Sequence, residues 1–185
     1  MLASGGGTIL QALLDSGLPV EVVVVDRACG ATERATAAGV PVEFVERGSF
    51  GPDFDRLAYT HRVVDALRQH GVDLVAMAGF MTILEKPVHD EFGGRILNTH
   101  PSLLPAFKGA HAVEDALAAG VTVTGCTVHV ATLELDDGPI LAQEAVAVRD
   151  GDTVETLHER IKEVERRLYP QVVADLLHEE QEAEV

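Results

Sequence analysis

A segment in the middle of the chain carries polar side chains that could perform acid–base chemistry. The sequence GRILNTHPSLLPAFKG, residues 94 to 109, begins as an apolar run and turns polar at Asn98 and His100. Asn98 offers an amide donor, and His100 offers an imidazole that can exchange a proton near neutral pH. Residues two apart on a strand point to the same side, so both groups could act on one atom. The alternative is that both side chains only cap the strand end and satisfy backbone groups of the loop. The presence of two such residues at this position favours a functional site.

A carboxylate further along the chain could complete this set. Asp136 lies in LELDDGP, residues 133 to 139, which is ordinary turn chemistry when taken alone. It gains a function only if this loop folds back onto the strand of His100. Ser102, Cys29 and Cys126 have no base at motif spacing, so the sequence does not favour a covalent intermediate.

The other histidines form no H-x-x-x-H or paired-cysteine pattern, so no metal site is expected. His129 lies inside an alternating segment, which is typical of a hydrogen-bonded core histidine or one that supports the site from behind. His111 follows Gly109 near the candidate site, where solvent exposure and substrate contact both remain open.

A glycine-rich turn near the start of the chain is a candidate anion site. Residues 3 to 8, ASGGGT, precede a helical pattern, and backbone N–H groups at a helix N-terminus favour a phosphate. The third glycine of a G-x-G-x-x-G fingerprint would fall on Leu10, so the dinucleotide motif is absent. A tight turn without a ligand is the alternative.

These groups need a scaffold, and the first hundred residues predict one. Unbroken apolar runs indicate buried strands at residues 21–26, 73–79 and 95–98, and helical patterns that end on glycine lie at 8–17, 32–39 and 53–71. This alternation predicts an α/β fold with a doubly wound, mostly parallel sheet. Asn98 and His100 then lie at the carboxyl end of a strand, where such sheets build their sites. Only three residues precede the glycine turn, so the first strand is very short or the true start lies upstream.

The pattern changes after residue 120. Residues 122–132 and 140–148 alternate with period two and predict an antiparallel strand pair. Residues 153–180 predict a long C-terminal helix with a kink or break at Pro170, and residues 178–185 read as a frayed acidic tail. We expect a single domain over residues 1–185.

The charge balance narrows the possible partners. Fourteen basic and thirty acidic residues give a net charge of −16, which disfavours nucleic acid and anionic membrane surfaces. The sequence has no membrane span or signal peptide and only two cysteines, so we expect a soluble cytoplasmic protein with free thiols. A small anionic ligand would have to be held by local dipoles and a few placed cations.

Four segments together carry a resemblance to a known family. The combination of SGGGTILQALLD, AGFMTIL, RILNTHPSLLPAFKG and LDDGPILAQ, in this order, is similar to the glycinamide ribonucleotide formyltransferase family of purine biosynthesis over nearly the whole chain. The resemblance implies a Rossmann-like formyltransferase fold and direct formyl transfer from 10-formyltetrahydrofolate to the amine of glycinamide ribonucleotide, without a metal. It implies a monomer or weak homodimer, and it assigns catalysis to Asn98, His100 and Asp136.

The resemblance also implies two sets of binding residues. The substrate phosphate site falls on Gly7, Thr8, Ile9, Lys162 and Glu165. The folate site falls on Met81, Thr82, Ile83, Leu84, Thr132, Leu133, Glu134 and Leu135. Three positions depart from the family pattern: many members have Asn where this chain has Ile9, Arg at Thr82, and a second His at Val113.

Two other functions are compatible with the same residues. A 10-formyltetrahydrofolate deformylase would hydrolyse the same donor with the same Asn, His and Asp, although those proteins usually carry an additional N-terminal domain. A non-catalytic ligand-binding domain would bind without turnover, which leaves the complete Asn-His-Asp set unexplained. Methionyl-tRNA formyltransferases need a basic partner domain for their larger substrate.

Overall fold

The computed structural model describes residues 1–49 and 51–183, with side chains up to residue 179. The chain divides into two compact units, Met1–Leu97 and Asn98–Val185. The boundary falls inside strand β5 (Ile96–His100), so this strand begins in the first unit and ends in the second. The prediction of one domain over the whole chain stays a prediction.

The first unit is a parallel sheet made of short strands. Its strands are β1 (Leu2–Ala3), β2 (Val23–Val25), β3 (Val42–Phe44) and β4 (Val75–Met77), in the order β3-β2-β1-β4. The start of β5 follows β4, where the Val75 N–H donates to the Arg95 carbonyl at 2.9 Å. The β2 side chains are at most 1% exposed, as expected of a strand covered on both faces.

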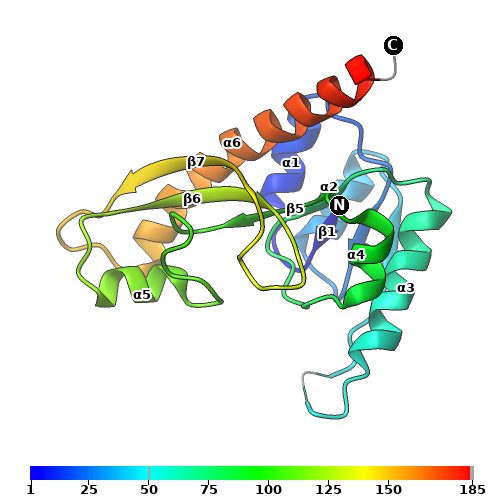
Figure 1. The fold of residues 1–185 in the computed structure, drawn as a ribbon, viewed down its shortest axis with the longest axis horizontal. Coiled ribbons are helices and arrows are strands. Elements are labelled where there is room, and N and C mark those ends of the chain that lie inside the picture. The colour runs from blue at the N-terminus through cyan, green and yellow to red at the C-terminus, as the bar shows by residue number, and fades with distance from the viewer. Residues whose placement is uncertain (50, 184–185) are drawn as a thin grey trace. The chain divides into compact units, whose positions relative to one another are not determined.

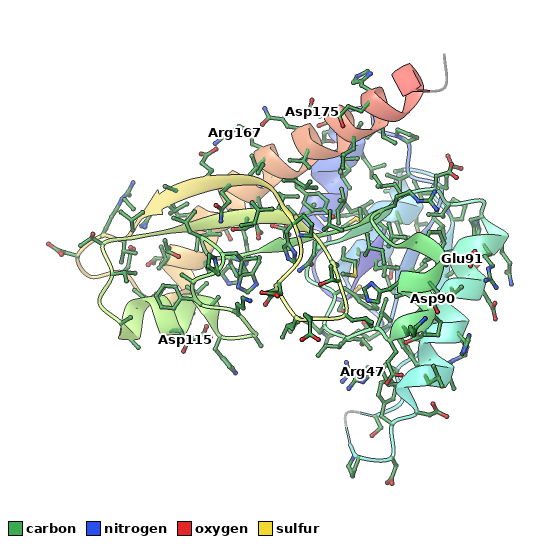
Figure 2. All side chains as sticks on the ribbon, viewed as in Figure 1. Arg47, Asp90, Glu91, Asp115, Arg167 and Asp175 are labelled. Carbon is green, nitrogen blue, oxygen red and sulfur yellow. The ribbon has the colours of Figure 1, made fainter. Side chains whose placement is uncertain are left out.

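Helices join these strands, as the alternating pattern predicts (Figure 1). They are α1 (Thr8–Asp15), α2 (Gly30–Ala37), α3 (Arg56–Gln69) and α4 (Lys86–Phe92). The α3 helix begins after Asp55, whose carboxylate accepts from the Ala58 N–H at 2.8 Å. Asp90 and Glu91 lie on α4 (Figure 2), and Glu91 pairs with Arg68 of α3 at 2.6 Å.

The second unit contains the end of β5, an antiparallel pair and two helices (Figure 1). Strands β6 (Val123–Val130) and β7 (Ile140–Ala147) pair antiparallel, and α5 (Ala112–Ala118) and α6 (Val154–Ala183) complete the unit. Leu157 and Ile161 of α6 pack on Val113, Cys126 and Val146 in a buried cluster. Arg167 of α6 (Figure 2) pairs with Glu144 of β7.

The α/β class, the mostly parallel sheet, the antiparallel pair and the long C-terminal helix are confirmed. A break at Pro170 is wrong, because α6 continues through this residue. Tyr169, Val172 and Val173 are buried, so burial on both sides of the proline holds the helix. The helix also continues through residues 178–183, and residues 184–185 of the expected frayed tail lie outside the described residues.

Three elements were not predicted. They are β3, α4 and α5, each seven residues or fewer. The sequence of β3, VEF, is only half-buried and shows no unbroken apolar run. None of the helices within the described residues is long and apolar enough to cross a membrane.

Candidate active site

The end of β5 presents alternate side chains in opposite directions. The Asn98 Nδ2 lies 3.2 Å from Nε2 of His129 on β6, whereas the Thr99 hydroxyl donates to Glu165 of α6 at 3.1 Å. His100 again faces the side of Asn98, because its ring approaches the loop between β6 and β7. The period-two geometry of the strand therefore presents Asn98 and His100 to the same surroundings.

His100 forms a buried pair with Asp136. Its Nδ1 lies 3.5 Å from Oδ2 of Asp136, and its Nε2 lies 2.8 Å from the carbonyl oxygen of Phe107. His100 is 5% exposed and Asp136 is 7% exposed. Both ring nitrogens face oxygen atoms: Nε2 is within hydrogen-bond distance of a carbonyl, and Nδ1 is within ion-pair distance of a carboxylate. The pair is therefore placed for proton exchange and charge stabilisation.

The loop of Asp136 does fold back onto the segment that follows β5. The Gly109 N–H donates to Asp136 Oδ2 at 2.8 Å, and the neighbouring Asp137 pairs with Lys108. Asp136 has a φ of 52°, in the left-handed region that Asn and Asp tolerate better than most residues. Two contacts between the same pair of loops therefore fix the carboxylate beside His100.

His129, expected from the sequence to be a hydrogen-bonded core histidine or one that supports the site from behind, is a member of this cluster. It is 1% exposed, and its Nε2 lies 3.8 Å from Oδ1 of Asp136 as well as 3.2 Å from Asn98. Burial lowers the pKa of His129, Asp136 acts in the opposite direction, and the nearby His100 lowers it further. The sequence feature that could have indicated this role is its position one residue from the end of β6, just before the loop that carries Asp136.

The possible nucleophiles are not activated. Burial raises the pKa of the Cys126 thiol to about 12, so its thiolate is not accessible near neutral pH. The Ser102 hydroxyl is buried and donates to the Ala106 carbonyl at 2.5 Å. The chemistry of this cluster is proton transfer and charge stabilisation.

Glu165 and Lys162 come from the same helix but differ in surroundings. Glu165 is 8% exposed, and burial raises its pKa. The Lys162 side chain is 37% exposed and lies 3.8 Å from Glu159. Lys162 is therefore able to meet an anion in solution, whereas the Glu165 carboxylate is suited to accept hydrogen bonds from hydroxyl groups.

The glycine turn belongs to the first unit and leads into α1. Gly7 is the N-cap of α1 with a φ of 71°, and the first helical hydrogen bond runs from the Gln11 N–H to the Gly7 carbonyl at 3.0 Å. The N–H groups of Thr8 and Ile9 precede this bond, as an anion site at a helix start requires.

Two arginines that the sequence analysis did not single out hold this turn. Arg27 donates to the Ser4 carbonyl at 2.9 Å, and Arg34 donates to the Gly6 carbonyl at 2.8 Å. They bring positive charge to the glycine turn of a chain whose net charge is −16. Their signal in the sequence was weak, because they lie 23 and 28 residues from the carbonyl groups that they contact.

The predicted folate residues divide into exposed and buried positions. Four of the nine large apolar side chains that are exposed among the described residues belong to this set, namely Met81, Ile83, Leu133 and Leu135. Thr82 and Leu84 are buried, and the Thr82 hydroxyl donates to Asp26 at 3.1 Å and accepts from Arg47 at 2.8 Å. Met81 and Ile83 are in the first unit, and Leu133 and Leu135 are in the second.

Among the described residues, no group of three or more His, Cys, Asp or Glu side chains could hold a metal ion. The ring of His111 is largely exposed and lies 4.0 Å from Glu114, in the same turn of chain. Cys29 and Cys126 are free thiols.

Comparison with known proteins identifies relatives over most of the chain. Residues 1–173 match the Formyl transferase family. Phosphoribosylglycinamide formyltransferase of Mycobacterium tuberculosis is 52% identical over 181 residues, which cover 95% of this chain and 83% of that protein.

Solved structures give the same relationship. Glycinamide ribonucleotide transformylase 1 from Symbiobacterium toebii has a TM-score of 0.88 and 45% identity, with 93% of this chain and 83% of that chain covered. Phosphoribosylglycinamide formyltransferase from Bacillus halodurans has a TM-score of 0.88 and 39% identity, with 95% and 93% covered.

Proposed function

Since this chain belongs to the formyl transferase family and acts as a glycinamide ribonucleotide transformylase in de novo purine biosynthesis, we propose that its donor is 10-formyltetrahydrofolate. We further propose that Asn98, His100 and Asp136 carry out the transfer. The observation that supports this assignment is the buried His100–Asp136 pair, 3.5 Å apart, on the side of β5 that also presents Asn98.

The reaction exchanges one C–N bond for another. The substrate amine attacks the formyl carbon, the carbonyl electrons move onto oxygen, and the bond from carbon to the folate nitrogen then breaks. One proton leaves the amine, and one proton is gained by the folate nitrogen, so no external oxidant or metal is needed. The barrier comes from the negative charge on oxygen and from the position of this proton.

Asn98 and His100 stabilise the negative charge that develops on the formyl oxygen. Asn98 has two amide hydrogens, and only one of them is directed to His129. The other can donate to the developing oxyanion. The Nε2 of His100 lies 2.8 Å from the Phe107 carbonyl, so His100, when it is protonated, stabilises the oxyanion through its charge rather than through a direct hydrogen bond.

Asp136 controls the position of the transferred proton. Its carboxylate is held by the Gly109 N–H and lies beside His100, so it orients the ring and stabilises positive charge that develops on the imidazole. A carboxylate at this place can also accept the amine proton and return it to the leaving nitrogen. Both roles require Asp136 to be ionised before the attack.

Binding is assigned to the remaining predicted residues. We propose that Gly7, Thr8 and Ile9 hold the substrate phosphate through their backbone N–H groups, and that Lys162 adds a cation. Because Glu165 is a carboxylate, its contact with the substrate suits hydroxyl groups rather than the phosphate itself. We propose that the exposed apolar side chains of Met81 and Ile83 in the first unit, and of Leu133 and Leu135 in the second, contact the flat heterocycle of the folate.

Donor turnover tests this proposal. The absorbance change of 10-formyltetrahydrofolate is followed with and without glycinamide ribonucleotide, and the products are separated as formyl-amide and free formate. We expect turnover that requires the amine and yields formyl-amide in equal amount. Formate release at the same rate without the amine would indicate hydrolysis, and absence of turnover with this donor would refute its assignment.

The oligomeric state and location are also proposals. We propose a monomer or weak homodimer, which light scattering across a range of protein concentrations would test, and a cytoplasmic location, which cell fractionation would test.

A further inference from the structure

His129 makes two contacts that define where its proton lies. Its Nδ1 is 3.1 Å from the carbonyl oxygen of Val130, and its Nε2 is 3.2 Å from Nδ2 of Asn98. A carbonyl oxygen can only accept, so Nδ1 carries a hydrogen. An amide nitrogen can only donate, so Nε2 presents a lone pair. Together these contacts select the neutral ring with its proton on Nδ1.

The same contact determines the direction of the Asn98 amide. An amide side chain can turn by half a revolution, which exchanges its oxygen for its nitrogen. With the Nε2 lone pair of His129 opposite, the turned orientation would set the amide oxygen against another acceptor. His129 therefore keeps the NH₂ group of Asn98 in place and occupies only one of its two hydrogens.

His129 and His100 differ in the hydrogen-bonding groups that face their rings, although Asp136 lies near both. His100 has an oxygen atom beside each of its two ring nitrogens. His129 is 1% exposed, has a donor at Nε2, and would share the neighbourhood with a second positive charge. Neighbouring groups that differ in this way commonly divide acid–base tasks within one site.

Protonation of His129 would change its partner. A protonated Nε2 could no longer accept from Asn98, and its hydrogen would face Oδ1 of Asp136, 3.8 Å away. The charged groups that act on the ring are His100 from β5 and Asp136 from the loop after β6, and its register neighbour on β7 is the apolar Ile140. At low pH, protonated His129 would therefore lose its hydrogen bond with Asn98 and would compete with His100 for the Asp136 carboxylate.

We propose that His129 is a positioning residue that, as a neutral ring protonated on Nδ1, orients the Asn98 amide toward the reacting carbonyl. This inference rests on the proposed role of Asn98 in the transfer. It adds a residue that touches neither substrate and that acts only through Asn98.

Two substitutions separate this role from simple packing. His129→Gln keeps an oxygen that can accept from Asn98, whereas His129→Leu fills space without an acceptor. Removing one oxyanion donor typically lowers kcat about 100- to 1,000-fold. Loss of the correct orientation of the Asn98 amide should lower kcat by a smaller factor. We expect His129→Leu to lose about 10- to 100-fold in kcat with little change in KM, and His129→Gln to recover most of the loss.

The proton position is measured without any activity assay. Nitrogen NMR of protein labelled at histidine, with the His129 signals identified by their absence in His129→Gln, distinguishes protonated from unprotonated ring nitrogens. We expect a protonated Nδ1 and an unprotonated Nε2 at pH 7.5. A proton on Nε2, or equal kcat in His129→Leu and wild type, would overturn the proposal.

The pH profile and one further variant complete the test. In wild type, kcat should fall in acid as His129 gains a proton, and His129→Gln should lack this acid limb. Asn98→Ala checks the underlying function separately. If Asn98→Ala kept wild-type kcat, the catalytic assignment would fail whatever the NMR result. If Asn98→Ala were inactive and Nε2 carried the proton, only the role of His129 would fail.

Discussion

His100 Nδ1 and Asp136 Oδ2 lie 3.5 Å apart in a buried part of the second unit. A second acceptor, the Phe107 carbonyl, lies 2.8 Å from the other ring nitrogen. We propose that this imidazole and this carboxylate supply the charge stabilisation and the proton acceptor that formyl transfer needs. The pair also explains why the strand sequence ILNTH turns from apolar to polar residues at its end.

Lys162 should contribute mainly to substrate binding. A charge-assisted hydrogen bond contributes about 1.5–3 kcal/mol, so Lys162→Met should raise KM for glycinamide ribonucleotide about tenfold or more and change kcat much less. Steady-state kinetics with varied ribonucleotide provides the measurement. Arg167→Met is the matched control, because Arg167 is on the same helix and pairs with Glu144. Equal KM in Lys162→Met and wild type would remove Lys162 from the phosphate site.

Glu165→Gln should raise stability while it weakens substrate binding. Burial raises the pKa of Glu165, so the folded state is penalised for its charge at neutral pH, and a neutral amide removes the penalty. We expect a higher Tm for Glu165→Gln than for wild type at pH 7. The gain should shrink as pH falls, because Glu165 then becomes protonated in wild type.

Thermal unfolding at pH 7 and at lower pH measures this effect. Glu163→Gln, an exposed neighbour on α6, is the control and should leave Tm unchanged. A Glu165→Gln protein less stable than wild type at pH 7 would show that the ionised carboxylate stabilises the fold.

His129 should make the fold less stable in acid. Its pKa is lowered from 6.5, so below about pH 6.5 the unfolded chain binds a proton that the folded chain does not. Stability is therefore lost as pH falls, by at most about 1.4 kcal/mol per pH unit for one such group. Unfolding in urea between pH 7.5 and 5.5 should show a shallower loss for His129→Gln than for wild type. His111→Gln, at an exposed histidine, should retain the wild-type slope, and an equal slope for His129→Gln would contradict the assignment.

The glycine turn should tolerate a side chain at one position and not at another. A Cβ at Gly7 would lie 2.7 Å from the Cα of Ala31 and would be in a left-handed conformation, whereas a Cβ at Gly5 meets nothing within 4 Å. The left-handed backbone alone costs about 1–2 kcal/mol for an alanine. Gly7→Ala should therefore lower Tm and raise KM for the ribonucleotide, and Gly5→Ala should do neither. A Gly7→Ala protein with both values unchanged would exclude the turn as the phosphate site.

The sequence predicted most of the scaffold because buried parallel strands leave an unmistakable apolar pattern. Residues 21–26 and 73–79 contain β2 and β4, and the alternating residues 122–132 and 140–148 contain β6 and β7. β3 was not predicted, because its three residues are not fully buried and form no unbroken apolar run. Local rules also failed at Pro170, where burial of the surrounding helix outweighs the loss of one backbone hydrogen bond.

The candidate site was predictable only in part. The spacing of Asn98 and His100 follows from strand geometry, but the approach of Asp136 depends on contacts such as that with Gly109, 27 residues away. The regular alternation around His129 left both a core role and a role behind the site open, because alternation does not reveal which polar group lies opposite. The family resemblance supplied the substrates, which the residues alone did not specify.

Single-turnover formyl transfer by Asp136→Asn tests the role of the His100–Asp136 pair most directly. Asn tolerates the φ of 52° at this position and can still accept from the Gly109 N–H, so the substitution removes the charge and keeps the shape. Asp137→Asn is the matched control, since Asp137 is the exposed neighbour and pairs with Lys108. With saturating 10-formyltetrahydrofolate and glycinamide ribonucleotide, we predict that Asp136→Asn slows transfer about 100- to 10,000-fold and that Asp137→Asn stays near wild type. A wild-type rate constant in Asp136→Asn, with its fold intact by thermal unfolding, would contradict this account.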